Sequence, residues 1–337
     1  MVTKKRSKNI DTLLEKAKQF EDNGDYPAAA RQYQDALDIS TANPGIWGLL
    51  GWTLLHAGDL KEALTAAKKM RSIAIKMRSK PLLAVADCLM ARIHQAAGRK
   101  VYAERYYRES LDAQPRSETY VLLADFWADQ DHAREARECY QNALAIAPDN
   151  TEAHYNLALG YLKNQDYENA IKHLRRIIDI DPQHVAAIRE LVRTLWQFRS
   201  TGFKEALYLL REAILDNPRN AEIHLLLAYT YKLLKKQRDA EGVFRTALEN
   251  ISGDSRLHWG FACFLNRDMK NPEAAEYHFQ KALALDPDNG AIHYYYGEAL
   301  QGWEREEDAR EQLEAARKLG YENAADYAET EEETIAR

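Results

Sequence analysis

Histidine is the residue type here best suited to ligate a metal or transfer a proton, and the sequence contains ten. The four that invite a metal search lie far beyond the i, i+4 spacing at which two histidines of one helix share an ion: His154, His224, His258 and His293. The sequence contains no glycine-rich phosphate loop, no Gly-x-Ser-x-Gly elbow and no His-Glu-x-x-His pair. We therefore predict no metal site, no cofactor and no catalytic centre, and we do not expect an enzyme.

The chain is built from a recurring unit, which is clearest between Thr151 and His184. In its first half, His154, Leu157 and Tyr161 recur at three- and four-residue spacing, which places them on one helix face. A polar turn follows, and a second helical pattern ends at Asp181-Pro182, because proline lacks the N–H that would continue a helix. Neither helix can bury its apolar stripe alone, so a period of about 34 residues predicts that each copy covers the next.

These copies resemble the tetratricopeptide repeat, whose signature is an aromatic, Leu with a small residue, Tyr, Ala, an aromatic, Ala and Pro. The fourth copy matches it with Tyr120, Leu123, Ala124, Trp127, Ala136, Tyr140, Ala143 and Pro148. The third copy departs from it, because Asp87 stands where the family has the first aromatic. The alanine that opens the second helix is present in every copy: Ala29, Ala63, Ala103, Ala136, Ala170, Ala206, Ala240, Ala275 and Ala309. The resemblance implies an all-α fold, an α-solenoid in which about nine antiparallel helix pairs form a right-handed superhelix.

Three regions are expected along the chain. Residues 1–9 carry four basic side chains and read as a disordered arm, and residues 10–321 hold the repeats. Residues 322–337 read as a capping helix followed by an acidic tail, since a solenoid needs a polar end.

In the family, the exposed face of each first helix lines a concave groove that binds other proteins. Helical spacing puts aromatic and basic residues on that face, the side chains that dominate binding hot spots. We expect a peptide or helix with acidic and apolar residues to bind there. The alternative is that Trp196, Tyr155 and Trp259 pack between neighbouring repeats and that the arginines pair with local acids such as Glu190. The predicted contact residues are Trp52, Arg92, Tyr155, Leu159, Arg189, Arg193, Trp196, Tyr229, Lys232, Arg256, Trp259 and Arg267.

The second helix of the second copy offers another surface. It is unusually basic, and a solvated face is the simplest interpretation, while a docking ridge for an acidic partner is the alternative. The residues concerned are Lys61, Lys68, Lys69, Arg71, Lys76 and Arg78.

Composition fits a protein-binding adaptor or scaffold. A formal charge of −6 argues against non-specific electrostatic binding of nucleic acid. Two alternative functions are a helical-repeat RNA binder and a self-assembling homo-oligomer. Three cysteines without paired spacing favour a reducing cytoplasm. The charged residues after the basic start exclude a signal peptide, and no apolar run is long enough for membrane insertion.

Overall fold

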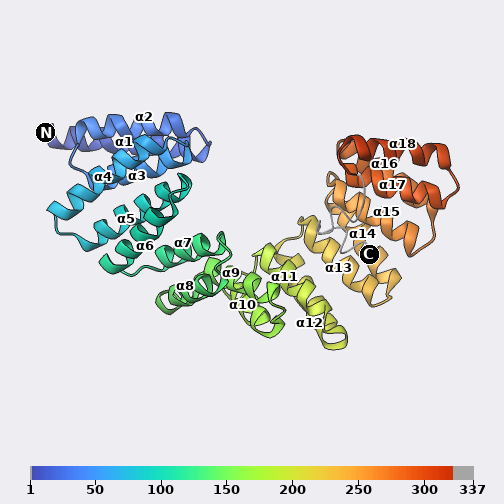
Figure 1. Ribbon diagram of the computed structural model, residues 1–337. Helices are drawn as coiled ribbons and strands as arrows, with labels where there is room; N and C mark the ends of the chain where they lie inside the picture. The colour runs from blue at the N-terminus through green and yellow to red at the C-terminus, as the bar shows by residue number, and fades with distance from the viewer. Residues whose placement is uncertain (1, 322–337) are drawn as a thin grey trace. The chain divides into compact units, whose positions relative to one another are not determined.

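The computed structural model describes residues 2–321, and all regular structure in this range is helical (Figure 1). The helices divide between two compact units, Met1–Asn164 and Gln165–Arg337. The N-terminal unit contains α1 (Val2–Asp22), α2 (Tyr26–Ile39), α3 (Pro44–His56), α4 (Leu60–Lys76), α5 (Lys80–Ala96), α6 (Lys100–Ala113), α7 (Ser117–Ala128), α8 (Ala133–Ile146) and α9 (Thr151–Lys163).

The C-terminal unit contains the other described helices. These are α10 (Tyr167–Ile180), α11 (Val185–Trp196), α12 (Arg199–Asp216), α13 (Ala221–Leu233), α14 (Gln237–Asn250), α15 (Ser255–Arg267), α16 (Pro272–Leu285), α17 (Gly290–Gly302) and α18 (Glu306–Lys318). The 18 helices of the described range fit the predicted nine repeats.

Within each unit the helices form an α-solenoid of stacked pairs. In the N-terminal unit α3 packs on α4, α5 on α6 and α7 on α8, and each pair also contacts the next (Figure 1). In the C-terminal unit, α13 with α14, α15 with α16 and α17 with α18 repeat the arrangement. No helix in residues 2–321 is both long and apolar enough to cross a membrane.

One end of the chain differs from expectation. α1 begins at Val2, so the arm predicted to be disordered over residues 1–9 is helical from residue 2 onward. The helix is continuous to Asp22, because nothing between the basic residues and the apolar stripe breaks it: the segment lacks proline and glycine. The capping helix and acidic tail predicted for 322–337 lie outside the described residues.

Each helix pair contributes one small residue at the same position to the core. The alanine near the start of each second helix is 0–5% exposed. The register predicted from sequence is therefore confirmed in all nine copies, at Ala29, Ala63, Ala103, Ala136, Ala170, Ala206, Ala240, Ala275 and Ala309.

Side-chain caps start several of the helices. Asp59 accepts a hydrogen bond from the Glu62 backbone N–H at the start of α4, and Asn150 accepts one from Ala153 at the start of α9. Such caps satisfy N–H groups that have no partner inside the helix. They fix where each helix begins and thereby which residues face the neighbouring pair.

The turns between paired helices need a left-handed residue. Gly58, between α3 and α4, has φ +82°, and Lys235 has φ +57° at the matching turn between α13 and α14. We expect Gly58→Ala to lower the free energy of unfolding by about 1 kcal/mol, because a Cβ disfavours this conformation. Urea denaturation followed by circular dichroism measures the change. Gly160→Ala, inside α9, is the control and should raise stability; a similar loss in both variants would contradict the explanation.

Candidate functional site

The basic residues predicted for the groove of the C-terminal unit are largely paired within it. Arg189 Nη1 lies 2.9 Å from Glu222 Oε1, and its Nε lies 3.2 Å from Glu190. Three further pairs involve predicted residues: Lys232 with Asp268 at 3.2 Å, Arg267 with Glu298 at 3.1 Å and Arg256 with Asp254 at 2.7 Å. Most of these pairs join one first helix to the next, so they hold adjacent repeats together.

Arg193 differs from these residues. Its side chain is partly exposed on α11, and it forms no ion pair within residues 2–321. It is the predicted arginine of this unit that is best placed to meet an acidic ligand.

The predicted aromatic residues of the same unit pack inward. Trp259 is 2% exposed with its ring 5.5 Å from that of Tyr295, and Tyr229 is 6% exposed against Phe244. Trp196 is partly buried, and its Nε1–H donates to Thr230 Oγ1 at 3.2 Å. Trp259 and Tyr229 thus pack between neighbouring repeats and expose little surface to a ligand.

In the N-terminal unit, polar side chains from three first helices converge. Asp125 on α7 accepts hydrogen bonds from the Tyr140 hydroxyl at 2.5 Å and from Asn156 Nδ2 at 3.1 Å. Burial raises the pKa of Asp125, and the nearby guanidinium of Arg92 on α5 partly offsets this. Burial also raises the pKa of Glu152 on α9, with the charge of Asp125 adding to the effect and Arg92 opposing it. Arg92 therefore faces two carboxylates of its own unit.

The remaining predicted residues of this unit differ in accessibility. Trp52 is partly buried against the cluster around Leu89 and Ile93, and Tyr155 is also partly exposed. Leu159 on α9 is 39% exposed, which is high for a large apolar side chain. It marks the place where this face opens.

A cavity of about 330 Å³ lies beside Leu159, between α7, α8 and α9. Its apolar lining is Ala128, Ala133, Ala136, Leu157, Leu159 and Gly160. Small residues make the space, and at Gly160 a Cβ would meet no atom within 4 Å.

Cations border the apolar lining of this cavity. The Arg137 guanidinium lies 5.1 Å from the centre of the Tyr161 ring, and Lys163 Nζ lies 3.8 Å from Asp131 Oδ1 at an exposed pair. Arg137 and Lys163 both line the cavity, as do Tyr140 and the amides of Asn156 and Asn164. Apart from Leu159, none of the residues that line the cavity is among the contact residues predicted from the sequence. The sequence did contain an indication of the cavity, because the small residues Ala128, Ala133 and Gly160 stand on its lining helices and leave space unfilled.

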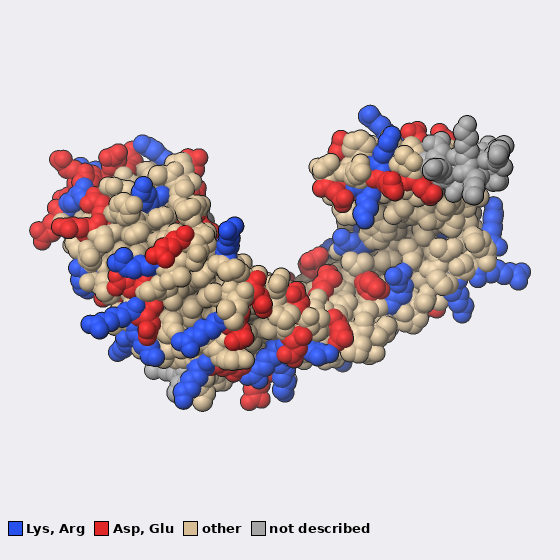
Figure 2. Space-filling view, turned by 180° about the vertical axis from the view of Figure 1, so that it is seen from behind, with Lys and Arg blue, Asp and Glu red and all other residues tan. Residues whose placement is uncertain are grey.

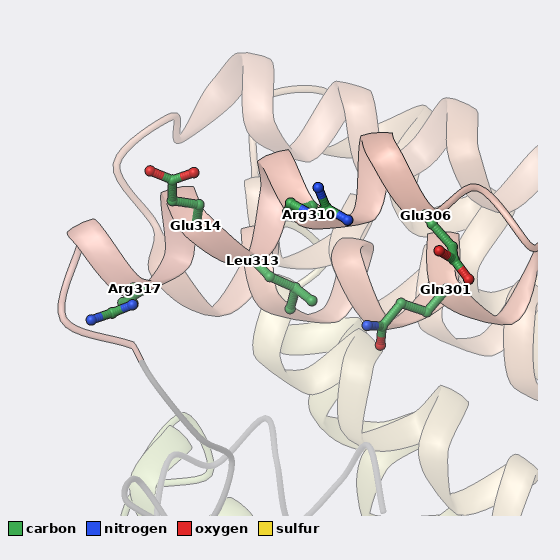
Figure 3. Close-up of a pocket in the computed structure, with 6 residues that line it drawn as sticks. All are labelled: Gln301, Glu306, Arg310, Leu313, Glu314 and Arg317. Atoms are coloured by element: carbon green, nitrogen blue, oxygen red, sulfur yellow. The ribbon is translucent and has the colours of Figure 1, made fainter.

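A larger, shallower hollow of about 730 Å³ lies on α17 and α18. Figure 3 shows Leu313 with charged side chains to either side, and the remaining lining residues are polar. With one apolar side chain among its six lining residues, this hollow suits an apolar anchor less well than the cavity beside Leu159.

The basic residues of α4 have two different environments. Arg71 Nε lies 2.5 Å from Asp87, which is 1% exposed, and Arg71 Nη2 lies 3.0 Å from Glu109. Arg71 is thus committed to an internal pair. The lysines of α4 are exposed and form no ion pair among the described residues: Lys61, Lys68, Lys69 and Lys76. Arg78, which was predicted to lie on this helix, is also exposed but follows the helix end in a turn, with φ +52°.

The repeated histidines contact backbone carbonyls. His154, His224 and His293 each donate from Nε2 to the carbonyl of the preceding proline, at 2.9–3.0 Å. His258 instead lies with its Nδ1 2.9 Å from Nδ1 of His278. The three proline contacts anchor α9, α13 and α17 to the loops that precede them, and the contact between His258 and His278 joins α15 to α16.

Sequence comparison finds tetratricopeptide repeat models matching residues 125–185 and, with a second model, residues 21–74 and 267–330. The chain is 22% identical over 301 residues to mouse interferon-induced protein with tetratricopeptide repeats 2, covering 79% of this chain and 62% of that protein. It is 25% identical over 256 residues to tetratricopeptide repeat protein 21B of Xenopus laevis, covering 72% of this chain and 19% of that one. The chain therefore spans less than two thirds of either relative.

Among solved structures, the C-terminal part of a tetratricopeptide repeat protein from Cytophaga hutchinsonii superposes with a TM-score of 0.53. The two are 14% identical, and the match covers 73% of this chain and 98% of that one. This likeness supports the fold. With the paired helices, the nine alanines and the matching models, the chain belongs to the tetratricopeptide repeat family.

Proposed function

We propose that this chain is a non-catalytic scaffold that binds a protein segment at the cavity between α7, α8 and α9. The segment carries an apolar anchor next to acidic residues. The observation that carries this proposal is an open apolar cavity of about 330 Å³ with Arg137 and Lys163 on its border.

The size of the cavity favours a side-chain anchor. Its volume is near the lower end of ligand sites, about 300–1,000 Å³, so it suits one or two side chains better than a large cofactor. Burying such an anchor contributes about 1.5–3 kcal/mol, and the cations on the border of the cavity then orient the flanking acids.

The RNA-binding alternative has less support. A base needs an accessible aromatic face on which to stack, and Tyr229 is 6% exposed. Trp196 is partly buried.

Gly160→Leu tests the proposal, because the new side chain would occupy the cavity. A random peptide-display library is selected against the unaltered protein, and the enriched peptides are then titrated against both proteins by fluorescence anisotropy. We expect peptides with an apolar residue beside Asp or Glu, and at least about tenfold weaker binding to the variant, since the anchor loses its site.

Gly242→Leu is the matched control. Gly242 is also an exposed helical glycine with no atom within 4 Å of an added Cβ, and it lies on α14, in the other unit. Both variants should be as stable as the unaltered protein or more so, because leucine favours helix over glycine by about 0.8 kcal/mol. Equal binding by all three proteins, or equal loss in both variants, would disprove the assignment of the cavity.

A further inference from the structure

The exposed side of α4 is a row of lysines without local partners. Lys61 and Lys68 are seven residues apart, as are Lys69 and Lys76, so each pair lies on one side of the helix about 10.5 Å apart. None of the four forms an ion pair within the described part of the chain. α4 has 17 residues, so both lysine pairs lie on one continuous helix.

Further cations and apolar side chains continue this surface toward α6. Arg99 and Lys100 at the start of α6 are exposed and lack ion pairs among residues 2–321. The next two residues, Val101 and Tyr102, are 79% and 52% exposed, although both side chains are largely apolar. We call Lys61, Lys68, Lys69, Lys76, Arg99 and Lys100, with Val101 and Tyr102, the basic ridge.

An aromatic stack ties the two parts of the ridge together. The His94 ring lies 5.3 Å from the rings of both Tyr102 and Tyr106. Burial lowers the pKa of His94, and the positive charges of Arg99 and Lys68 lower it further. The Arg71 guanidinium of α4 lies 6.0 Å from the centre of the Tyr106 ring, so α4 contacts this stack.

Glu62 is the one acid on α4 and forms no ion pair among the described residues, but acids of the neighbouring helices α5 and α6 are engaged elsewhere. Asp87 and Glu109 bind Arg71, and Glu104 binds Arg108 at 2.7 Å. Figure 2 shows blue side chains projecting from the outer edge of the N-terminal unit without red ones beside them. In a chain whose formal charge is −6, the ridge is a local excess of positive charge.

We propose that the basic ridge binds an acidic amphipathic helix of a partner protein, with Glu or Asp at seven-residue spacing opposite the lysines and an apolar residue against Val101 and Tyr102. A helix laid along α4 repeats every seven residues with the same rise, so its carboxylates meet both lysine pairs. Phosphates of one duplex strand recur about every 3.4 Å along the axis, so every third phosphate falls close to the lysine spacing. The apolar side chains distinguish the two ligands, because exposed Val101 would find no apolar contact on a phosphate backbone.

The probe is a synthetic 21-residue helical peptide with Glu at seven-residue intervals and leucines on the adjoining face, titrated by fluorescence anisotropy. Its control is a scrambled peptide of equal composition. We expect Lys61→Glu/Lys68→Glu/Lys69→Glu/Lys76→Glu to weaken binding by roughly tenfold or more, because four attractive pairs become repulsive. Val101→Ser should weaken it roughly threefold through lost apolar contact.

The matched charge control is Lys204→Glu/Lys235→Glu/Lys236→Glu/Arg238→Glu, which changes net charge equally in the C-terminal unit and should retain binding. Gly160→Leu should also retain it, which separates this surface from the proposed cavity site. Equal loss in the two charge variants, equal binding of the scrambled peptide, or tighter binding of single-stranded RNA or phosphatidylserine vesicles than of the probe would overturn the proposal.

Discussion

Replacing Arg71 by alanine is expected to lower the free energy of unfolding by about 3 kcal/mol. Asp87 is 1% exposed, and the variant would leave its carboxylate buried without the guanidinium that lies 2.5 Å away. Removing one partner of a buried pair costs about 3–5 kcal/mol, and we take the lower end because Arg71 is itself 32% exposed. Urea denaturation at pH 7.5 measures the loss. Lys69→Ala, on the exposed side of the same helix, should change stability little.

The loss of unfolding free energy caused by Arg71→Ala should become smaller as the pH falls. Burial raises the pKa of Asp87, and Arg71 opposes that rise, so the Arg71→Ala variant has a still higher folded-state pKa. A carboxyl whose pKa is higher folded than unfolded favours the folded state as the pH falls through the folded pKa. The difference between the variant and the unaltered protein should thus be smaller at pH 5 than at pH 7.5. Adding Asp87→Asn should remove most of this dependence, and a loss that does not vary with pH would contradict the explanation.

Trp259→Ala is the other large expected effect, a loss of about 3–5 kcal/mol. The side chain is 2% exposed and its ring packs on Tyr295, so truncation leaves a cavity between repeats. Denaturation followed by circular dichroism measures it, since fluorescence would change with the tryptophan itself.

Arg193→Ala is the comparison for Trp259→Ala, because Arg193 is partly exposed and has no ion pair in the described chain. It should cost less than about 1 kcal/mol. If Trp259→Ala were equally mild, Trp259 would be available to a ligand after all. A binding test that replaces Arg193 and Trp259 together would confuse lost folding with lost contact.

The sequence could predict the repeats because their information is local. Spacing of small and apolar residues along a helix determines which alanines are buried, and Ala63 and Ala170 were assigned correctly for this reason. The position of Asp87, which breaks the signature, was also visible, but its partner was not. Arg71 lies on the preceding helix, and the sequence grouped it with the solvent-facing lysines of α4.

The predicted groove residues show where such reasoning ends. Helical spacing assigns a residue to a face, but whether that face is open depends on the side chains of the next repeat. Tyr229 is covered in this way, whereas Leu159 remains accessible beside Gly160. The cavity arises from three helices with small side chains at facing positions, which no single repeat reveals.

Photo-crosslinking tests the proposed binding site most directly. p-Benzoylphenylalanine is placed at position 159, on the cavity, or at position 208, where Tyr208 on α12 is 68% exposed. Each protein is irradiated with a display-selected peptide, and adducts are mapped by mass spectrometry. We predict an adduct from position 159 to the apolar anchor of the peptide, and little from position 208. Adducts from position 208 alone, or equally from both positions, would contradict binding at the cavity.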